Sequence, residues 1–156
     1  MELIAEKIDE FIAEGKDFDT ICKEAQEYTD RCKLIFCLKS LTNLANNGRV
    51  SAAAAKISKL LNLRIVGRAS DVGTLEMESK PRGDKNAHIE ILRFMKELGY
   101  TGGKVIISHC LALDAANSLA DVIKGVFANA RIKINECGAL CSFYAEEGGL
   151  IVGFEA

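Results

Sequence analysis

Few side chains of this 156-residue chain stand in patterns that perform chemistry. The sequence has no Gly-x4-Gly-Lys phosphate loop, no Gly-x-Ser-x-Gly nucleophile turn and no His-Glu-x-x-His zinc motif. His109 has no second histidine near it in sequence, and the neighbouring acids Glu146 and Glu147 fall in a predicted loop, where carboxylates are usually solvated. The sequence therefore indicates a binding protein, not an enzyme.

The six cysteines do not form a metal-binding pattern. Cys32/Cys37 and Cys137/Cys141 are separated by four and three residues, whereas zinc ribbons use Cys-x2-Cys pairs. Most of the cysteines lie in or beside apolar runs, where cysteine acts as a small hydrophobic residue. We expect reduced, buried thiols, with Cys22 the best candidate for an exposed one. A metal or redox role is the alternative, and no cofactor is expected.

Several polar residues lie where ligand contacts are common. His109 ends a predicted strand, the usual position of ligand-facing residues in α/β sheets, although it could equally cap the helix that follows. Arg82 falls in the first turn of a predicted helix, where the helix dipole disfavours a cation. Arg49 follows Gly48 in a turn and could simply bond nearby carbonyls. Gly148 and Gly149 would let backbone approach a ligand, or could form only a turn.

Hydrophobic periodicity and turn residues predict the elements that position these residues. Asp17 or Asp19 should cap the second helix, Ser51 the third long helix, and Asp84 the fourth. A turn at 71–73 should join two strands into a hairpin, and 138–149 should be a glycine-punctuated loop. The predicted helices are 2–14, 17–28, 52–61, 85–98 and 114–128, and the predicted strands are 33–38, 63–70, 74–79, 105–108, 131–136 and 150–154.

Alternating helices and strands, interrupted by one hairpin, predict an α/β (α+β-like) fold. We expect a mixed sheet of about five or six strands with helices mainly on one face. With 49% hydrophobic residues the chain can fill one core. Its net charge of −2 offers no general attraction to nucleic acid, no apolar run approaches the roughly 20 residues of a membrane span, and the acidic start is no secretory signal. A cytoplasmic protein is expected.

Five segments, in order, resemble the second domain of DegV-family fatty-acid-binding proteins. The most specific segment joins Leu-x-x-Leu-x-x-Leu to a Gly-Arg-Val-Ser turn. The second segment is Leu-Leu-Asn, just before the predicted hairpin. Further matches are Lys-Pro-Arg-Gly-Asp-Lys-Asn-Ala, a strand ending in His109, and Glu-Cys-Gly followed by Gly-Gly-Leu-Ile-Val-Gly-Phe. The matching segments are 38–51, 60–62, 80–87, 105–109 and 136–154.

The resemblance implies a DegV-like second domain at 31–156, preceded by a helical lead-in at 1–30 from a missing N-terminal domain. It also implies that a long-chain fatty acid binds in a cleft shared with that domain and is presented to a fatty acid kinase. No nucleic acid and no stable membrane insertion are expected, whereas the exposed cleft could favour self-association. The ligand-binding residues that it implies are Tyr144, Arg82, His109, Arg49, Ser142, Gly148 and Gly149.

The chain departs from the family pattern in its last loop. Tyr144 stands where the family has a histidine, and a phenol donates a hydrogen bond but carries no positive charge at neutral pH. Glu146 and Glu147 would repel a carboxylate if they pointed at it. Two alternatives therefore stay open: a substrate-binding subunit like that of dihydroxyacetone kinases, which share the fold and would need His109, or a divergent relative that binds another lipid or a protein.

Overall fold

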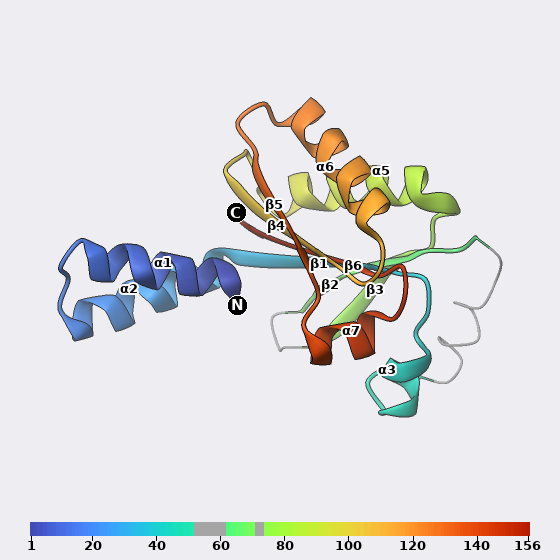
Figure 1. Ribbon diagram of the computed structural model, residues 1–156, viewed down its shortest axis with the longest axis horizontal. Helices are drawn as coiled ribbons and strands as arrows, with labels where there is room; N and C mark the ends of the chain where they lie inside the picture. Colours follow the sequence, from blue (N-terminus) through green and yellow to red (C-terminus); the bar gives the residue numbers. More distant parts are fainter. Residues whose placement is uncertain (52–61, 71–73) are drawn as a thin grey trace.

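The computed structural model describes residues 1–51, 62–70 and 74–156 and is built around one twisted, mixed sheet (Figure 1). The six strands lie in the order β3-β2-β1-β6-β4-β5. Only β4 and β5 are parallel neighbours; every other pair is antiparallel. This confirms the predicted fold class. The strands are β1 (Cys32–Leu38), β2 (Ile65–Ala69), β3 (Leu75–Ser79), β4 (Lys104–His109), β5 (Arg131–Glu136) and β6 (Leu150–Glu155).

Two long helices cover one face of the sheet and enclose the main core. These are α5 (Gly83–Glu97) and α6 (Leu113–Val126), seen above the sheet in Figure 1. Alternate residues of the central strands point toward them, because side chains of a strand alternate between its two faces. The ring of Tyr100 closes the core edge-on against Phe127 and Phe154. Fully buried strand residues on this face include Ile35, Cys37, Val66, Val105, Ile107, Val152 and Phe154.

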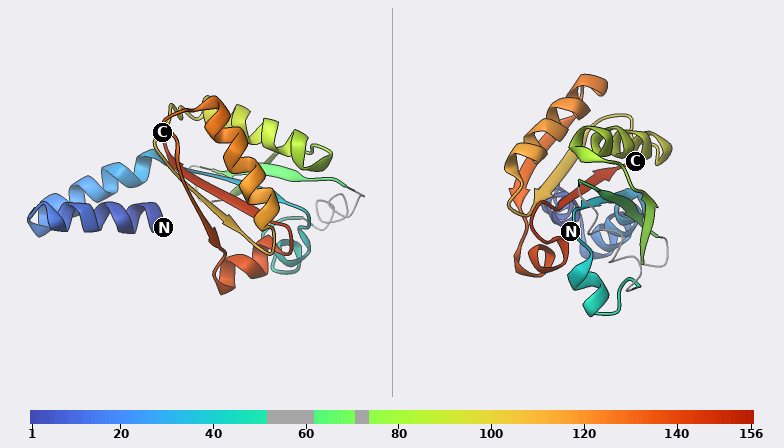
Figure 2. Two further views of the ribbon diagram at one scale, coloured as in Figure 1. Left: turned by 45° about the horizontal axis from the view of Figure 1, so that its top comes forward. Right: turned by 90° about the vertical axis from the view of Figure 1, so that its right-hand side faces the viewer.

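The opposite face carries separate groups of helices at its two ends (Figure 2). At one end α1 (Glu2–Ala13) and α2 (Phe18–Arg31) form a hairpin that projects from the body. At the other end lie the short helices α3 (Thr42–Asn46) and α7 (Ala139–Ala145). The stretch of sheet between these two groups has no helix of the described residues over it.

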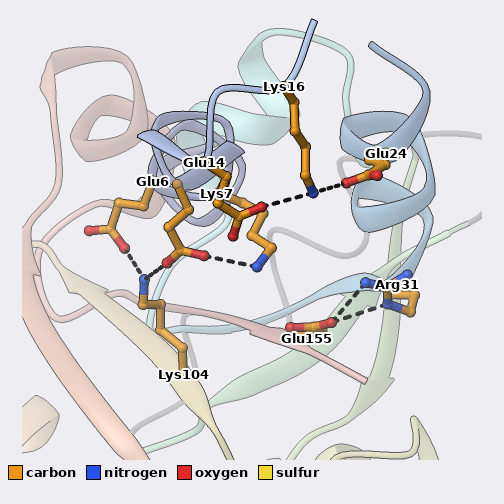
Figure 3. A network of polar contacts seen from close by, with 9 residues as sticks. Glu6, Lys7, Glu14, Lys16, Glu24, Arg31, Lys104 and Glu155 are labelled. Carbon is orange, nitrogen blue, oxygen red and sulfur yellow. Dashed lines mark hydrogen bonds and ion pairs between the residues drawn. The ribbon is translucent and has the colours of Figure 1, made fainter. Parts of the chain in front are cut away.

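Ion pairs hold the projecting hairpin to the sheet (Figure 3). Glu6 of α1 contacts Lys104 of β4 at 2.7 Å and Lys133 of β5 at 3.1 Å. Arg31, the last residue of α2, pairs with Glu155 of β6 at 3.0 Å. These contacts are supplemented by a small apolar cluster of Leu3, Tyr28 and Ile106. The hairpin is therefore attached at its base, while its tip extends away from the sheet.

Three sequence-based expectations need correction. The segment 138–149 is not only a loop, because it contains α7. Asp84 is not the cap of α5: Arg82 occupies that position, and Asp84 lies in the first turn, where it pairs with Arg64 at 2.6 Å. Of the six thiols only Cys37 is buried.

Two other expectations, the Asp17 cap and an exposed Cys22, are confirmed. Asp17 caps α2 by accepting the Thr20 backbone N–H, and Cys22 is exposed. The helix predicted at 52–61 and the hairpin turn at 71–73 lie outside the described residues, although β2 and β3 pair as expected. Within the described ranges, no helix is both long and apolar enough to cross a membrane.

Candidate functional site

An apolar groove lies between α3 and α7, on the face of the sheet opposite α5 and α6. Its volume is about 250 Å³, and its floor is formed mainly by β1 and β6. Other hollows are larger, but one of about 790 Å³ beside α1 and β5 is lined mostly by charged residues. The groove is the hollow whose chemistry suits an apolar ligand. Its lining residues are Leu34, Phe36, Leu38, Leu44, Arg49, Leu75, Leu140, Cys141, Tyr144, Ala145 and Ile151.

The floor follows from strand alternation combined with a glycine. Leu34, Phe36 and Leu38 are alternate residues of β1 and therefore share one face. Ile151 lies opposite Phe36 on β6, and Gly67 lies opposite it on β2. A Cβ at Gly67 would come within 2.5 Å of the Phe36 ring, so the missing side chain leaves room for this ring.

The wall formed by α7 depends on close contact with the backbone beneath it. A Cβ at Gly149 would lie 2.4 Å from the carbonyl oxygen of Ala145, the last residue of α7. At Gly148, where φ is +84°, a Cβ would collide with the Lys39 side chain. Both glycines are buried, and their positions allow the helix to sit directly on the sheet.

The groove has one cationic, hydrogen-bonding edge. The guanidinium of Arg49 lies 4.8 Å from the ring centre of Tyr144, a cation–π contact. Arg49 is exposed and Tyr144 is half-buried, so both keep polar atoms available at the edge of the apolar surface. A guanidinium carries five N–H donors and a phenol one. This arrangement suits a ligand with an apolar body and an anionic or hydrogen-bonding head.

The carboxylate of Glu146 is engaged in joining α7 to α3. The backbone N–H of Asn43 donates to Glu146 Oε1 at 2.9 Å, and the Asn43 side chain donates to the Phe143 carbonyl at 2.7 Å. The acid next to the groove therefore accepts a hydrogen bond at the start of α3. Glu147 is exposed.

Ser142 lies on α7 and serves as an anchor for this helix. Its hydroxyl donates to the Cys137 carbonyl at 2.9 Å, which closes the turn that leads into α7. Ser142 is half-buried and is absent from the groove lining.

Arg82 and His109 do not line the groove. His109 is 5% exposed, and its Nδ1 accepts the backbone N–H of Ala112 at 3.3 Å, so it orders the turn before α6. It borders a separate polar hollow that also includes Lys39, Asp84 and Glu136. Arg82 is exposed at the start of α5. Of the residues predicted from sequence, the structure brings only Arg49 and Tyr144 together in the groove lining. Ligand contacts by all of them stay predictions.

Sequence reasoning missed the floor of the groove and its α7 wall. The apolar run of β1 indicated burial on both faces, whereas Leu34 is 36% exposed. A signal for α7 was present: Leu140 and Tyr144 are four residues apart, on one helical face, between flanking glycines. Across the described part of the chain, no group of three or more His, Cys, Asp or Glu residues is placed to hold a metal ion.

Comparisons with known proteins agree with this architecture. The family model described as DegV, a family of uncharacterised proteins, matches residues 1–156. A DegV domain-containing protein of Streptococcus pyogenes serotype M1 is 38% identical over 155 residues, which are 99% of this chain and 55% of that protein. The chain thus spans about half the length of the curated relatives it matches.

Two similar solved structures contain fatty acids. A DegV family protein of Eubacterium eligens, loaded with heptadecanoic acid, is 38% identical with a TM-score of 0.96 over 99% of this chain and 56% of its own. The fatty acid kinase B3 protein of Streptococcus pneumoniae, loaded with linoleic acid, is 37% identical with a TM-score of 0.94 over 98% of this chain and 54% of its own.

Proposed function

This chain belongs to the DegV family, and from that membership and the geometry of the groove we propose that it binds a long-chain fatty acid between α3, α7 and the sheet. The observation that carries the proposal is the combination of an apolar groove with the Arg49–Tyr144 pair at its edge. Loaded relatives at 37–38% identity support the choice of ligand.

The energetics favour an acyl chain in such a groove. Each buried methylene contributes about 0.8 kcal/mol, so a sixteen-carbon chain gains on the order of 10 kcal/mol before entropic costs. The head group must stay solvated or find donors, because burying an unpaired carboxylate is prohibitive. The guanidinium of Arg49 supplies charge-assisted donors, and Tyr144 adds a neutral one. Of these two donors, Arg49 provides the positive charge, which Tyr144 cannot provide at neutral pH.

The groove, as the described residues line it, would cover only part of an acyl chain. We propose that the rest of the cleft is formed by an additional N-terminal domain, to which residues 1–30 lead, with 31–156 as the lipid-binding domain. The length of the relatives supports this, because the match covers only 55% of the S. pyogenes protein. Alone, the apolar groove would favour self-association.

The role we propose is that of a carrier in the cytoplasm that presents its fatty acid to a partner kinase. The name of the S. pneumoniae relative, a fatty acid kinase B3 protein, supports such a partner. Within this role the chain contributes binding and orientation of the ligand, and the kinase contributes the chemistry.

Extraction and titration test the proposal. Purified protein is extracted with solvent for mass spectrometry, and the delipidated chain is titrated with a fluorescent fatty acid. We expect an acyl ligand in the extract, and weaker binding by Leu140→Asp, because this residue lines the groove, is 70% exposed and can be changed without disturbing the core. Leu111→Asp, which is 79% exposed outside the groove, is the matched control. No acyl ligand, and equal binding by both variants, would refute the proposal.

The head-group role is tested by a second pair of variants. Arg49→Gln should weaken binding of a fatty acid about 10-fold or more but leave binding of the corresponding neutral alcohol unchanged, since the lost charge-assisted hydrogen bond is worth roughly 1.5–3 kcal/mol. Arg93→Gln is the control, because this arginine pairs with Glu90 and Glu97 on the exposed side of α5. Equal affinity for acid and alcohol in the parent chain would instead favour a divergent relative with another lipid ligand.

A further inference from the structure

One edge of the sheet is formed by a regular strand with a free outer side. β5 is the last strand in the sheet order, and among the described residues it pairs only with β4 (Figure 1). Its sequence, Arg-Ile-Lys-Ile-Asn-Glu, contains no proline, and its register with β4 runs from Arg131 to Glu136 without a shift. Such an edge is a template for pairing with a further strand.

The backbone groups on this outer side follow from the pairing with β4. The N–H of Cys137, directly after β5, donates to the carbonyl of His109 at 2.8 Å. Because the backbone groups of successive residues point to opposite sides of a strand, those of Ile132, Ile134 and Glu136 point away from β4. No described residue is hydrogen-bonded to these N–H and C=O groups. The outer side therefore offers a donor and an acceptor at every second residue.

The opposite edge of the sheet, formed by β3, is less suited to pairing. The register between β3 and β2 shifts at Val66 and Gly67. A second β3 paired around Met77 would bring Glu76 opposite Glu78. Bulges and like charges protect an edge strand against association. The two edges therefore differ in their capacity to add a strand.

Two antiparallel copies of β5 would match in one register. With Ile134 opposite Ile134 of the second copy, Ile132 lies opposite Glu136, and all outward backbone groups of both strands are paired. Lys133 then lies opposite Asn135. A register centred on Lys133 would place two lysines opposite each other, where like charges repel. A register centred on Asn135 would leave the outward groups of Ile132 unpaired.

The charges around the strand are complementary in this register. Directly opposed residues share a face, so Glu136 of one copy would lie on the same face as Ile132 of the other. Lys124, near the end of α6, lines the same hollow as Ile132. Among the described residues, neither Lys124 nor Glu136 has an ion-pair partner. On the other face, Lys133 is already paired with Glu6 of its own chain at 3.1 Å.

We propose that two copies of this chain associate through β5 as a symmetric dimer with one continuous sheet. An antiparallel pair of identical strands is isologous, which closes the assembly at two copies. The two-fold axis stands perpendicular to the sheet, so the apolar grooves of both copies open on the same face. The dimer is independent of the proposed function, because no residue of β5 lines the groove.

Disulfide formation in mixed chains tests the register. Opposed residues of a non-hydrogen-bonded antiparallel pair have Cα atoms about 4.5 Å apart, which a disulfide can span. Mild oxidation of an equal mixture of Lys133→Cys and Asn135→Cys chains should yield a cross-link between positions 133 and 135, identified by peptide mapping. Neither variant alone should cross-link at its substituted position. No cross-link in the mixture, or equal cross-linking in each variant alone, would overturn the proposal.

Charge reversal tests the contacts beside the strand. Sedimentation velocity of the parent chain should show a reversible equilibrium between monomer and dimer. Lys124→Glu and Glu136→Lys should each weaken the dimer about 10-fold, because each places like charges together twice in a symmetric interface, and the double variant should restore it. Lys85→Glu, which changes an exposed lysine on α5, is the matched control and should leave the dimer unchanged. Failure of the double variant to restore the dimer would contradict this arrangement.

A groove variant distinguishes this interface from association through the groove. Leu140→Asp should leave the dimer intact, because Leu140 lines the groove and lies outside β5. A dimer lost in Leu140→Asp but retained in Lys124→Glu would place the interface at the groove and refute pairing through β5. A parent chain that stays monomeric at all concentrations would refute it as well. Loss of fatty-acid binding with a retained dimer would instead concern only the proposed function.

Discussion

The two faces of the sheet use alternate residues of the same strands for opposite purposes. On the face covered by α5 and α6, Ile35 and Cys37 of β1 are fully buried in a continuous core. On the other face, Leu34 is 36% exposed and Leu75 of β3 is 37% exposed, both along the groove. Composition does not distinguish the faces, since both are apolar. The difference is that helices fill one face, while on the other they stand apart and leave a groove.

This contrast assigns folding stability mainly to one face of the sheet and ligand binding to the other. The filled face should carry most of the folding free energy, because burial of apolar area is its main source. Substitutions of the partly exposed groove residues should change the free energy of unfolding little, but should weaken ligand binding.

The largest effect is expected for Phe154→Ala on the filled face. Phe154 is fully buried and packs edge-on against Tyr100 at 5.3 Å, and such truncations cost about 3–5 kcal/mol. Leu34→Ala on the groove face should cost about 1 kcal/mol or less, because this side chain is already partly in water. Urea denaturation measures both free energies of unfolding. Similar losses for the two variants would contradict the division between the faces.

The next largest effect is expected where α7 packs against the backbone of Gly149. Gly149→Ala would place a Cβ 2.4 Å from the Ala145 carbonyl oxygen, and such overpacking costs about 1–3 kcal/mol. Because α7 must move, fatty-acid affinity should fall as well. Gly125→Ala in α6 is the control: a Cβ there meets no atom within 4 Å, so this change should stabilise the chain by about 0.5–1 kcal/mol. Unchanged ligand affinity in Gly149→Ala would argue against α7 as a groove wall.

A smaller effect is expected for an ion pair beside the filled face. The Arg64 side chain is only 9% exposed, whereas its partner Asp84 is 47% exposed. Asp84→Asn would leave a nearly buried guanidinium with a weaker partner, at a cost of about 1–2 kcal/mol, which is less than for a fully buried pair. Glu97→Gln, which breaks an exposed pair with Arg93 on the same helix, should cost at most about 0.5 kcal/mol. Equal effects would mean that the burial of Arg64 does not matter.

The smallest effect is a pH dependence from His88 of α5. This residue is 3% exposed, and burial lowers its pKa below the ordinary 6.5, although the charge of nearby Asp84 opposes the shift and that of Arg64 adds to it. Below pH 6.5 the unfolded chain binds a proton that the folded chain does not, so stability should decline as pH falls from about 6.5 toward the lower folded pKa. His88→Gln should flatten this decline between pH 7 and pH 5 in urea denaturation. An identical slope in both chains would contradict the assignment.

The sequence predicted the sheet better than the groove. Alternation in β5, the continuous run of β1 and the paired strands β2 and β3 were recognisable because strand periodicity is a local property. The segment of α7 was predicted as a loop because its seven residues, flanked by glycines, are too short for a clear helical period. Asp84 looked like a cap because its type suits that position, yet its partner Arg64 lies twenty residues away in sequence.

The sequence by itself determined the strands, the long helices of the described residues, the absence of recognised catalytic motifs, and the family, because each of these depends on short-range patterns of residue type. Only the tertiary structure decided that Arg49 and Tyr144 meet over an apolar groove and that Glu146 is engaged by Asn43. The physical reason is that these contacts join residues up to about a hundred positions apart. Their proximity depends on strand order and on how closely helices can approach glycine-lined backbone.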